Sequence, residues 1–178
     1  MGTPKAELML GGRPILEHLL DRACWDAGPT MLVLAPGQAL PRGSDRFDRI
    51  ARDDQPGQGP LRGVLTALHH ATTPHVVITT VDMPMIAHEH LEWLADQLDA
   101  HPAAHGVFIS RDELEPFPSA YRTSASDPIA SQLEANRRAV HAMSRLSGFV
   151  TVAAPISWTD ETWTNLNTPE DVQRFELR

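Results

Sequence analysis

The spacing of apolar residues along the chain predicts helices that alternate with strands. Four segments repeat apolar residues every three or four positions, as one face of a helix does: 15–24, 61–71, 91–98 and 128–146. Four others are short apolar or β-branched runs, as strands are: 30–35, 76–80, 106–110 and 149–156. Three weaker segments predict short extended pieces: 7–10, 49–51 and 119–122. We expect segment 128–146 to break near Asn136, and a final helix to open at Thr168-Pro169 and end near Phe175.

This order of elements predicts an α/β protein. Strands that alternate with helices form βαβ units, so we expect a three-layer α/β/α architecture with a mostly parallel sheet, in a single domain that spans residues 1–178. In such sheets, ligands bind beyond the carboxyl ends of the strands. The residues that follow each predicted strand are therefore the first place to look for chemistry.

Composition narrows the class of partner. The formal net charge is −8 and the 15 basic residues are spread without a block, which argues against binding of long nucleic acids. No apolar run approaches the ~20 residues of a membrane span, and the start of the chain has no signal-peptide pattern. The single cysteine, Cys24, fits a reducing compartment and is expected to be a small core residue. We therefore expect a cytoplasmic protein with small-molecule partners.

The strongest candidate for chemistry is a carboxylate that follows the most β-branched strand. Asp82 lies in residues 79–84, Thr-Thr-Val-Asp-Met-Pro. A carboxylate at the carboxyl end of a strand suits a hard cation such as Mg²⁺ bound to substrate phosphates. An ordinary turn aspartate is the alternative.

Three further features could contact a ligand. The loop 57–63, Gly-Gln-Gly-Pro-Leu-Arg-Gly, enters a helix whose N-terminal N–H groups attract anions, although it is not a P-loop. Lys5 could neutralise a phosphate. Asn165 and Asn167 alternate along an extended segment and so point to the same side, where two amides could hold a ligand. Each feature also has an ordinary reading, as a surface loop, a solvated lysine or a polar surface strand.

Histidine and serine chemistry is not favoured. The nine histidines show no zinc-ligand spacing, and His88 and His90, two apart on a predicted helix, face different directions. No Gly-x-Ser-x-Gly nucleophile motif occurs.

Taken in order, the motifs resemble those of the molybdenum-cofactor nucleotidyltransferases, and the Gly-Pro-Leu-x-Gly loop resembles the guanylyltransferase branch. That family opens with the signature Leu-Ala-Gly-Gly-x-Ser-x-Arg-Met-Gly-x-x-Lys. The matching segments cover nearly the whole chain: 1–6, 12–16, 59–63, 82–84, 117–121 and 165–169.

The resemblance implies a Rossmann-like nucleotidyltransferase fold and a reaction in which GMP passes from GTP to molybdopterin with release of pyrophosphate. It implies Lys5 and Asp82 as catalytic residues, with Asp82 as the ligand of Mg²⁺, for which Mn²⁺ is an alternative. The implied nucleotide-binding residues are Lys5, Asp53, Gly59, Pro60, Leu61, Gly63 and Asp82. The implied molybdopterin-binding residues are Pro118, Tyr121, Asn165 and Asn167. GTP and molybdopterin are the implied partners, and contact with molybdoenzymes or other cofactor-synthesis proteins is a further expectation.

The resemblance begins in the middle of the family signature, because Met1 matches the methionine that follows its arginine. The first strand and its glycine-rich loop are therefore expected to be missing, and we hypothesise that the natural protein starts upstream. That strand is central in this topology, so its loss would leave unpaired backbone groups inside the sheet.

Two alternatives stay open. The chain could be a related enzyme that uses CTP or a sugar phosphate. It could also be a non-catalytic remnant that keeps the scaffold.

Overall fold

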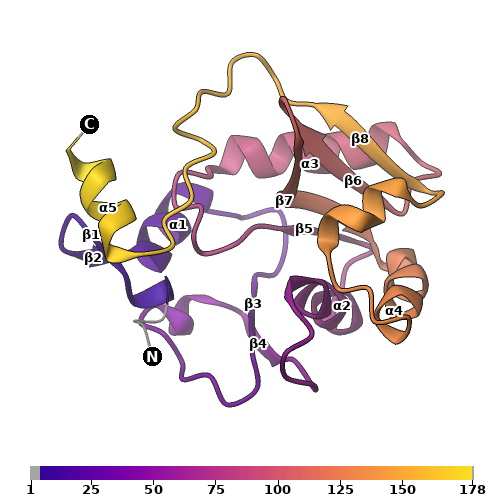
Figure 1. Ribbon diagram of the computed structural model, residues 1–178, viewed down its shortest axis with the longest axis horizontal. Coiled ribbons are helices and arrows are strands. Elements are labelled where there is room, and N and C mark those ends of the chain that lie inside the picture. The colour runs from indigo at the N-terminus through magenta and orange to yellow at the C-terminus, as the bar shows by residue number, and fades with distance from the viewer. Residues whose placement is uncertain (1–4, 178) are drawn as a thin grey trace.

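The computed structural model describes residues 5–177 and shows helices and strands in the expected alternation (Figure 1). The strands are β1 (Met9–Leu10), β2 (Arg13–Pro14), β3 (Met31–Leu34), β4 (Arg49–Arg52), β5 (His75–Ile78), β6 (Gly106–Ser110), β7 (Leu114–Arg122) and β8 (Phe149–Ala153). The α-helices are α1 (Ile15–Ala23), α2 (Pro60–His70), α3 (His88–Ala100), α4 (Ser126–Glu134) and α5 (Pro169–Glu176). The 3-10 turns are η1 (Lys5–Glu7), η2 (Ser44–Arg46), η3 (Thr123–Ala125) and η4 (Val140–Arg145).

The larger sheet has the strand order β5-β7-β6-β8 and is mixed rather than mostly parallel. Strand β7 runs antiparallel to both β5 and β6, whereas β6 and β8 are parallel. The physical reason is the short connection of residues 111–113 between β6 and β7, which can join only antiparallel neighbours. The α/β class is confirmed, and the expected share of parallel pairing is corrected.

A second, two-stranded sheet is formed by β3 and β4, which pair in parallel from Met31 with Arg49 to Leu34 with Arg52. Among the described residues, no strand joins this pair to the larger sheet. In Figure 1 the pair lies apart from the other strands, beside α2. The β3–β4 pair and the larger sheet are therefore separate, and the gap between them lies between β3 and β5.

Helices cover both faces of the larger sheet and form the expected three layers. Helix α3 packs against β5, β6 and β7 on one face, with α1 beside it, while α2 and α4 pack together on the other (Figure 1). The core between them includes the fully buried side chains of Phe108, Tyr121, Leu94 and Ile129. Burial of large apolar and aromatic side chains is the main stabilising contribution here.

Several element boundaries differ from the expectations. Segment 128–146 breaks as expected at Asn136, whose φ is 58°, but its second part is the 3-10 turn η4. Strand β7 begins five residues earlier than position 119, and β5 ends at Ile78, before Thr79. Cys24 is exposed at the left-handed C-cap of α1 with a φ of 34°, so it is not the core residue that was expected.

A small second core lies near the two ends of the described chain. Leu8, Ile15, Leu166 and Val172 are all buried there and join the β1–β2 hairpin to α5. Helix α5 begins as expected at Thr168, whose Oγ1 accepts a hydrogen bond from the Asp171 N–H at 3.2 Å. The C-terminal helix is therefore positioned by a cap and by a few apolar contacts.

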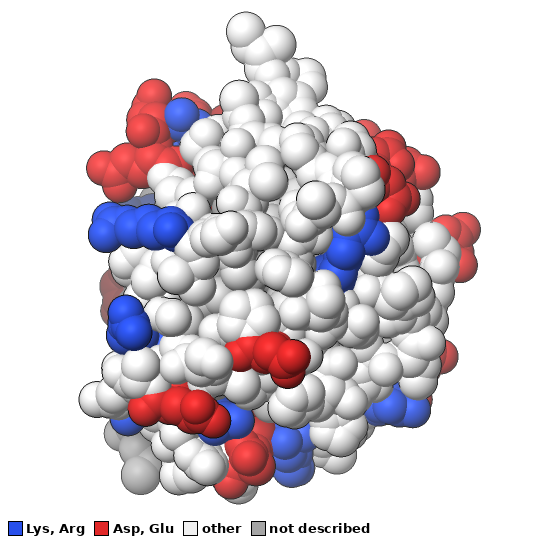
Figure 2. Space-filling view, turned by 90° about the vertical axis from the view of Figure 1, so that its right-hand side faces the viewer, with Lys and Arg blue, Asp and Glu red and all other residues white. Residues whose placement is uncertain are grey.

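Neither the helices nor the drawn surface of the described chain has a feature typical of membrane spans or of nucleic-acid binding. No helix within residues 5–177 combines the length and the hydropathy needed to cross a membrane. On the face drawn in Figure 2, lysine and arginine side chains alternate with acidic ones around a broad uncharged centre.

Candidate nucleotide site

The centre of the candidate site is an ion pair between two residues far apart in sequence. The Lys5 ammonium lies 2.7 Å from Asp82 Oδ2, and the side chains are 47% and 14% exposed. Asp82 follows β5 after a short turn. Lys5 lies in the 3-10 turn η1, the first element of the described chain. The structure thus brings together, at the carboxyl end of β5, the two residues predicted to be catalytic.

One oxygen of the Asp82 carboxylate remains available for a ligand. Asp82 Oδ1 is buried and has no hydrogen-bond partner within residues 5–177. The Thr79 hydroxyl, three residues earlier, is also buried and unpaired in the described chain. Buried polar atoms without partners are rare in folded proteins, because each costs about 1–3 kcal/mol. Asp82 Oδ1 therefore marks a place where a bound cation or polar group would fit, and the Thr79 hydroxyl is a second buried group at this end of β5 that lacks a partner within residues 5–177.

The C-terminal asparagine segment is held against Asp82. The Leu166 N–H donates to the Asp82 backbone carbonyl at 2.8 Å, and Leu166 is buried. Asn165 and Asn167, on either side of Leu166, are exposed. Asn165 also lines the cleft at this end of β5. The alternation predicted for the two asparagines is consistent with this pattern, although residues 165–167 form no sheet ladder.

Asp53 and the glycine loop lie across the same cleft. Asp53 directly follows β4, and its Oδ1 accepts a hydrogen bond from Thr66 Oγ1 of α2 at 2.7 Å. Gly59, Pro60 and Gly63 line the cleft at the start of α2. Gly59 has a φ of 70°, which favours glycine at the residue that leads into Pro60. The helix N-terminus therefore faces the cleft that contains the Lys5–Asp82 pair.

Three residues expected in the site lie in the core instead. Leu61 and Tyr121 have no exposed surface, and Pro118 is buried beside Tyr121 in β7. The Tyr121 hydroxyl is hydrogen-bonded to Ser119, and burial raises the pKa of Tyr121 far above its usual value. Strand β7 lies between β5 and β6, so both of its edges are paired, while helices and turns pack against its faces. We therefore assign these three side chains to packing, with only the backbone of Leu61 near the glycine loop.

Sequence reasoning missed two features of the site. The buried Thr79 hydroxyl was interpreted as part of the strand, although a polar residue at the end of an apolar run was a visible signal. Lys5 is also the only lysine among the 15 basic residues of the chain. A reagent selective for lysine side chains would therefore report on this site alone.

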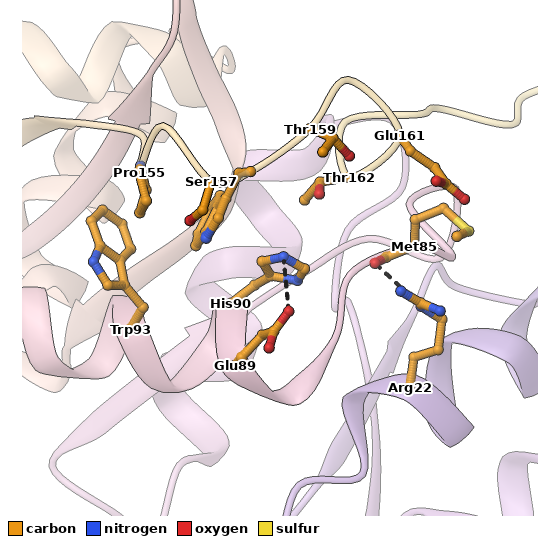
Figure 3. A pocket seen from close by; sticks show the side chains of 11 residues that line it. Arg22, Met85, Glu89, His90, Trp93, Pro155, Ser157, Thr159, Glu161 and Thr162 are labelled. Atoms are coloured by element: carbon orange, nitrogen blue, oxygen red, sulfur yellow. Dashed lines mark hydrogen bonds and ion pairs between the residues drawn. The ribbon is translucent and has the colours of Figure 1, made fainter.

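A second hollow of about 550 Å³ lies outside this site (Figure 3). Trp93 and His90 of α3 line it from one side and Thr159 and Glu161 from another, while Arg22 donates a hydrogen bond to the Met85 carbonyl at its rim. Burial lowers the pKa of His90, and Glu89 opposes this shift. None of the predicted site residues lines this hollow.

The fold and this site define a nucleotidyltransferase: an α/β scaffold in which a carboxylate, an ammonium and a helix N-terminus face one cleft. Residues 1–149 match the family model described as the MobA-like NTP transferase domain. Because the match covers most of the chain, the protein belongs to the MobA-like NTP transferase family.

Individual relatives agree with this family. The chain is 30% identical to the molybdenum cofactor guanylyltransferase of Cereibacter sphaeroides, over 98% of this chain and 88% of that protein. It is 28% identical to the enzyme of the same name from Rhizobium meliloti, over 99% of this chain and 84% of that protein. Its fold matches molybdopterin-guanine dinucleotide biosynthesis protein A of Archaeoglobus fulgidus with a TM-score of 0.77 at 24% identity, over 99% and 90% of the two chains.

Proposed function

We propose that this protein transfers GMP from GTP to molybdopterin and releases pyrophosphate. The observation that most directly supports this proposal is the Lys5–Asp82 ion pair at the carboxyl end of β5. Asp82 Oδ1 has no hydrogen-bond partner among residues 5–177. Membership of the family and the names of the relatives support the choice of guanylyl transfer.

The side chains present suit a reaction that depends on position and charge. A phosphate oxygen of molybdopterin would attack the α-phosphorus of GTP, forming a new P–O bond as the bond to pyrophosphate breaks. Such transfers need little covalent chemistry from the protein, and an ionised phosphate needs no general base. The Lys5 ammonium would offset the negative charge that develops on the departing pyrophosphate. The helix N-terminus at Gly59 and Pro60 would present backbone N–H groups to the nucleotide.

The residues present fit a divalent cation, which we propose to be Mg²⁺, with Mn²⁺ as the alternative. Asp82 Oδ1, which has no hydrogen-bond partner in the described chain, is a hard oxygen ligand at the place where phosphates would lie. Within residues 5–177 no group of three His, Cys, Asp or Glu side chains could enclose a metal. Asp82 would therefore hold the ion together with substrate phosphates and water, as is usual for Mg²⁺. When bound, the cation would supply Lewis-acid polarisation of the phosphates.

The two substrates would lie on opposite sides of the Lys5–Asp82 pair. Asp53 and the loop of Gly59, Pro60 and Gly63 form the proposed nucleotide side. Asn165 and Asn167 form the proposed molybdopterin side. A molybdoenzyme that receives the product is the expected protein partner.

Pyrophosphate release tests the proposal directly. The chain is incubated with GTP, Mg²⁺ and molybdopterin, and both pyrophosphate and the guanylated product are quantified. We expect Asp82→Asn to lower the rate by at least about 10²-fold, a loss comparable to removal of one oriented group that stabilises charge. Asp112→Asn, the same change at an exposed carboxylate in the β6–β7 turn, should keep the rate. Equal rates for the two variants would contradict the role of Asp82.

A nucleotide panel tests the choice of base, and the single lysine gives an independent readout. Product formed only from CTP would replace guanylyl transfer by cytidylyl transfer. Periodate-oxidised GTP reacts with nearby amines, so it should label Lys5, and excess GTP with Mg²⁺ should protect Lys5. A Lys5→Arg variant keeps the positive charge and should lose that label.

A further inference from the structure

The loop 54–59, which leads into α2, is a segment whose shape its own backbone does not fix. It lies outside the helices and strands, and Gly57 and Gly59 have φ values of 72° and 70°. Glycine has more conformational freedom than any other residue, so ordering such a loop is costly in entropy. The loop ends at Gly59, which lines the cleft of the candidate site. Contacts from side chains must therefore hold the loop in one shape.

The first of these contacts comes from Arg62, in the opening turn of α2. Its Nε donates to Gln58 Oε1 at 2.7 Å, and its Nη1 lies 3.3 Å from Asp54 Oδ1. The Arg62 side chain is only 13% exposed. A guanidinium presents its donors in a planar fork, so it can hold two partners in a fixed relation. Arg62 thereby connects both ends of the loop to the helix that follows it.

The second contact comes from the connection between α4 and η4. Arg138 Nη1 donates to the Gly57 carbonyl at 2.6 Å. A Cβ atom on Gly59 would lie 3.5 Å from the Arg138 carbonyl oxygen, so the two backbones run close together. This connection is anchored by the buried Val140 and by the packing of α4 on α2 (Figure 1). Arg138 therefore fixes the middle of the loop to a part of the chain far from it in sequence.

Neither arginine belongs to the described residues that line the cleft. At this end of the cleft the lining includes Asp53, Gly59 and Gly63, but not Arg62 or Arg138. The contacts of both guanidinium groups described above go to the loop. Any effect of the two side chains on a ligand in the cleft would therefore pass through the position of the loop.

We propose that Arg62 and Arg138 are positioning residues that keep the loop 54–59 in the shape in which Gly59 and the N-terminus of α2 receive the nucleotide. This inference rests on the proposed transfer from GTP. A site that is receptive for only a fraction of the time has an apparent Kd raised by the inverse of that fraction. Loss of a contact should therefore raise KM for GTP. It should leave kcat unchanged, because the loop is in place in every complex that has formed.

Steady-state kinetics with a matched pair of arginine variants test the position of Arg138. Arg138→Ala should raise KM for GTP about three- to tenfold, the effect of one lost hydrogen bond, and keep kcat within about twofold. Arg138→Lys retains a donor and should recover most of the loss. Arg137 is equally exposed, and its backbone N–H, rather than its side chain, donates to the Gln132 carbonyl. Arg137→Ala should therefore leave KM unchanged.

Two kinetic results would overturn the proposal. An equal rise in KM for Arg137→Ala and Arg138→Ala would show that positive charge near the site matters and that the contact to Gly57 does not. A fall in kcat for Arg138→Ala with KM unchanged would show that Arg138 acts on the reacting groups instead of on the loop.

The mobility of the loop gives a readout that needs no reaction. In nucleotide-free protein, the amide order parameters of Gly57 and Gly59 should be near the ~0.85 of rigid backbone and should fall toward about 0.6 in Arg138→Ala. Arg62→Met keeps the buried stem but removes the fork, and the double variant should give lower values than either single one. Unchanged values in Arg138→Ala, or a double variant equal to Arg138→Ala, would overturn the joint role. Absence of pyrophosphate release by the unaltered chain would instead contradict the proposed reaction, and the order parameters would still decide whether the arginines hold the loop.

Discussion

The four-stranded sheet and the β3–β4 sheet use similar apolar runs but bury them to different degrees. In the larger sheet, Val107, Phe108 and Ile109 of β6 have no exposed surface, because β7 and β8 flank the strand and helices cover its faces. In β3, the equally apolar Met31, Leu32 and Val33 remain partly exposed, because one edge and much of the side-chain surface face the cleft.

The difference shows that an apolar run specifies a buried strand only when a neighbour exists on each side. Strand β6 gains its neighbours through a tight hairpin with β7 and a parallel return by β8. Within the part of the chain that the structure describes, β3 gains one neighbour, β4, by a parallel pairing of four residues. We call the four-stranded sheet with its helices the closed side, and the β3–β4 sheet with the cleft beside it the open side. We therefore expect the closed side to contribute most of the stability, whereas the open side contains the candidate site.

The largest expected effect tests this division of stability. Phe108→Ala on the closed side should lower the free energy of unfolding by about 3–5 kcal/mol, because it opens a cavity where Phe108 meets Tyr121 and Phe149. Val33→Ala on the open side should cost only about 1 kcal/mol, because the side chain is already partly exposed. Urea denaturation of both variants measures the pair. Equal losses would mean that the cleft is closed in solution.

A smaller loss of stability is expected at the hydrogen bond that joins the end of β4 to α2. Thr66→Val keeps the shape of a side chain that is 7% exposed but removes its hydrogen bond to Asp53. We expect a loss of about 1.5 kcal/mol, as for other hydrogen bonds to a charged group. Thr72→Val, at an exposed turn position, is the control and should change stability by less than about 0.5 kcal/mol. A double-mutant cycle with Asp53→Ala, which removes the acceptor, should show coupling, and its absence would contradict the importance of this contact.

Loss of the N-cap of α5 should lower the stability of the small core that α5 forms with the β1–β2 hairpin. Thr168→Ala removes the hydroxyl that caps α5 and should cost about 1 kcal/mol, whereas Thr168→Ser should retain most of the stability. Thermal unfolding compares the three proteins. If alanine and serine have the same effect, packing by Leu166 and Val172 alone positions α5.

The smallest effect is a pH dependence on the closed side. His90 is 5% exposed, its Nδ1 accepts the Ala87 N–H at 2.8 Å, and burial lowers its pKa below 6.5. The unfolded chain then binds more protons, so the contribution of His90 is fully present above about pH 6.5 and is lost as the pH falls through the folded-state pKa. His90→Gln keeps an acceptor for the Ala87 N–H without titrating, so it should flatten stability below pH 6.5. An unchanged profile in denaturation at several pH values would contradict this role.

Local signals in the sequence were enough for most elements, and they selected the two residues that the structure brings together in the candidate site. Helical spacing located α1, α2 and α3, and the pair Thr168-Pro169 located the start of α5, because these signals act over a few neighbouring residues. The rule that ligands bind beyond strand ends selected Asp82. Motif resemblance added Lys5, and the structure places it 2.7 Å from Asp82.

The sequence by itself therefore determined the α/β class and the order of the elements, and it supplied the candidate residues Lys5 and Asp82. Only the tertiary structure decided that Tyr121, Pro118 and Leu61 pack in the core, that β7 runs antiparallel to both of its neighbours, and that Asp82 Oδ1 has no hydrogen-bond partner among residues 5–177. It also decided that β3 and β5 face each other across an open cleft. Burial and strand pairing depend on what lies beside a residue in space, and a local pattern of apolar positions contains no information about that neighbour.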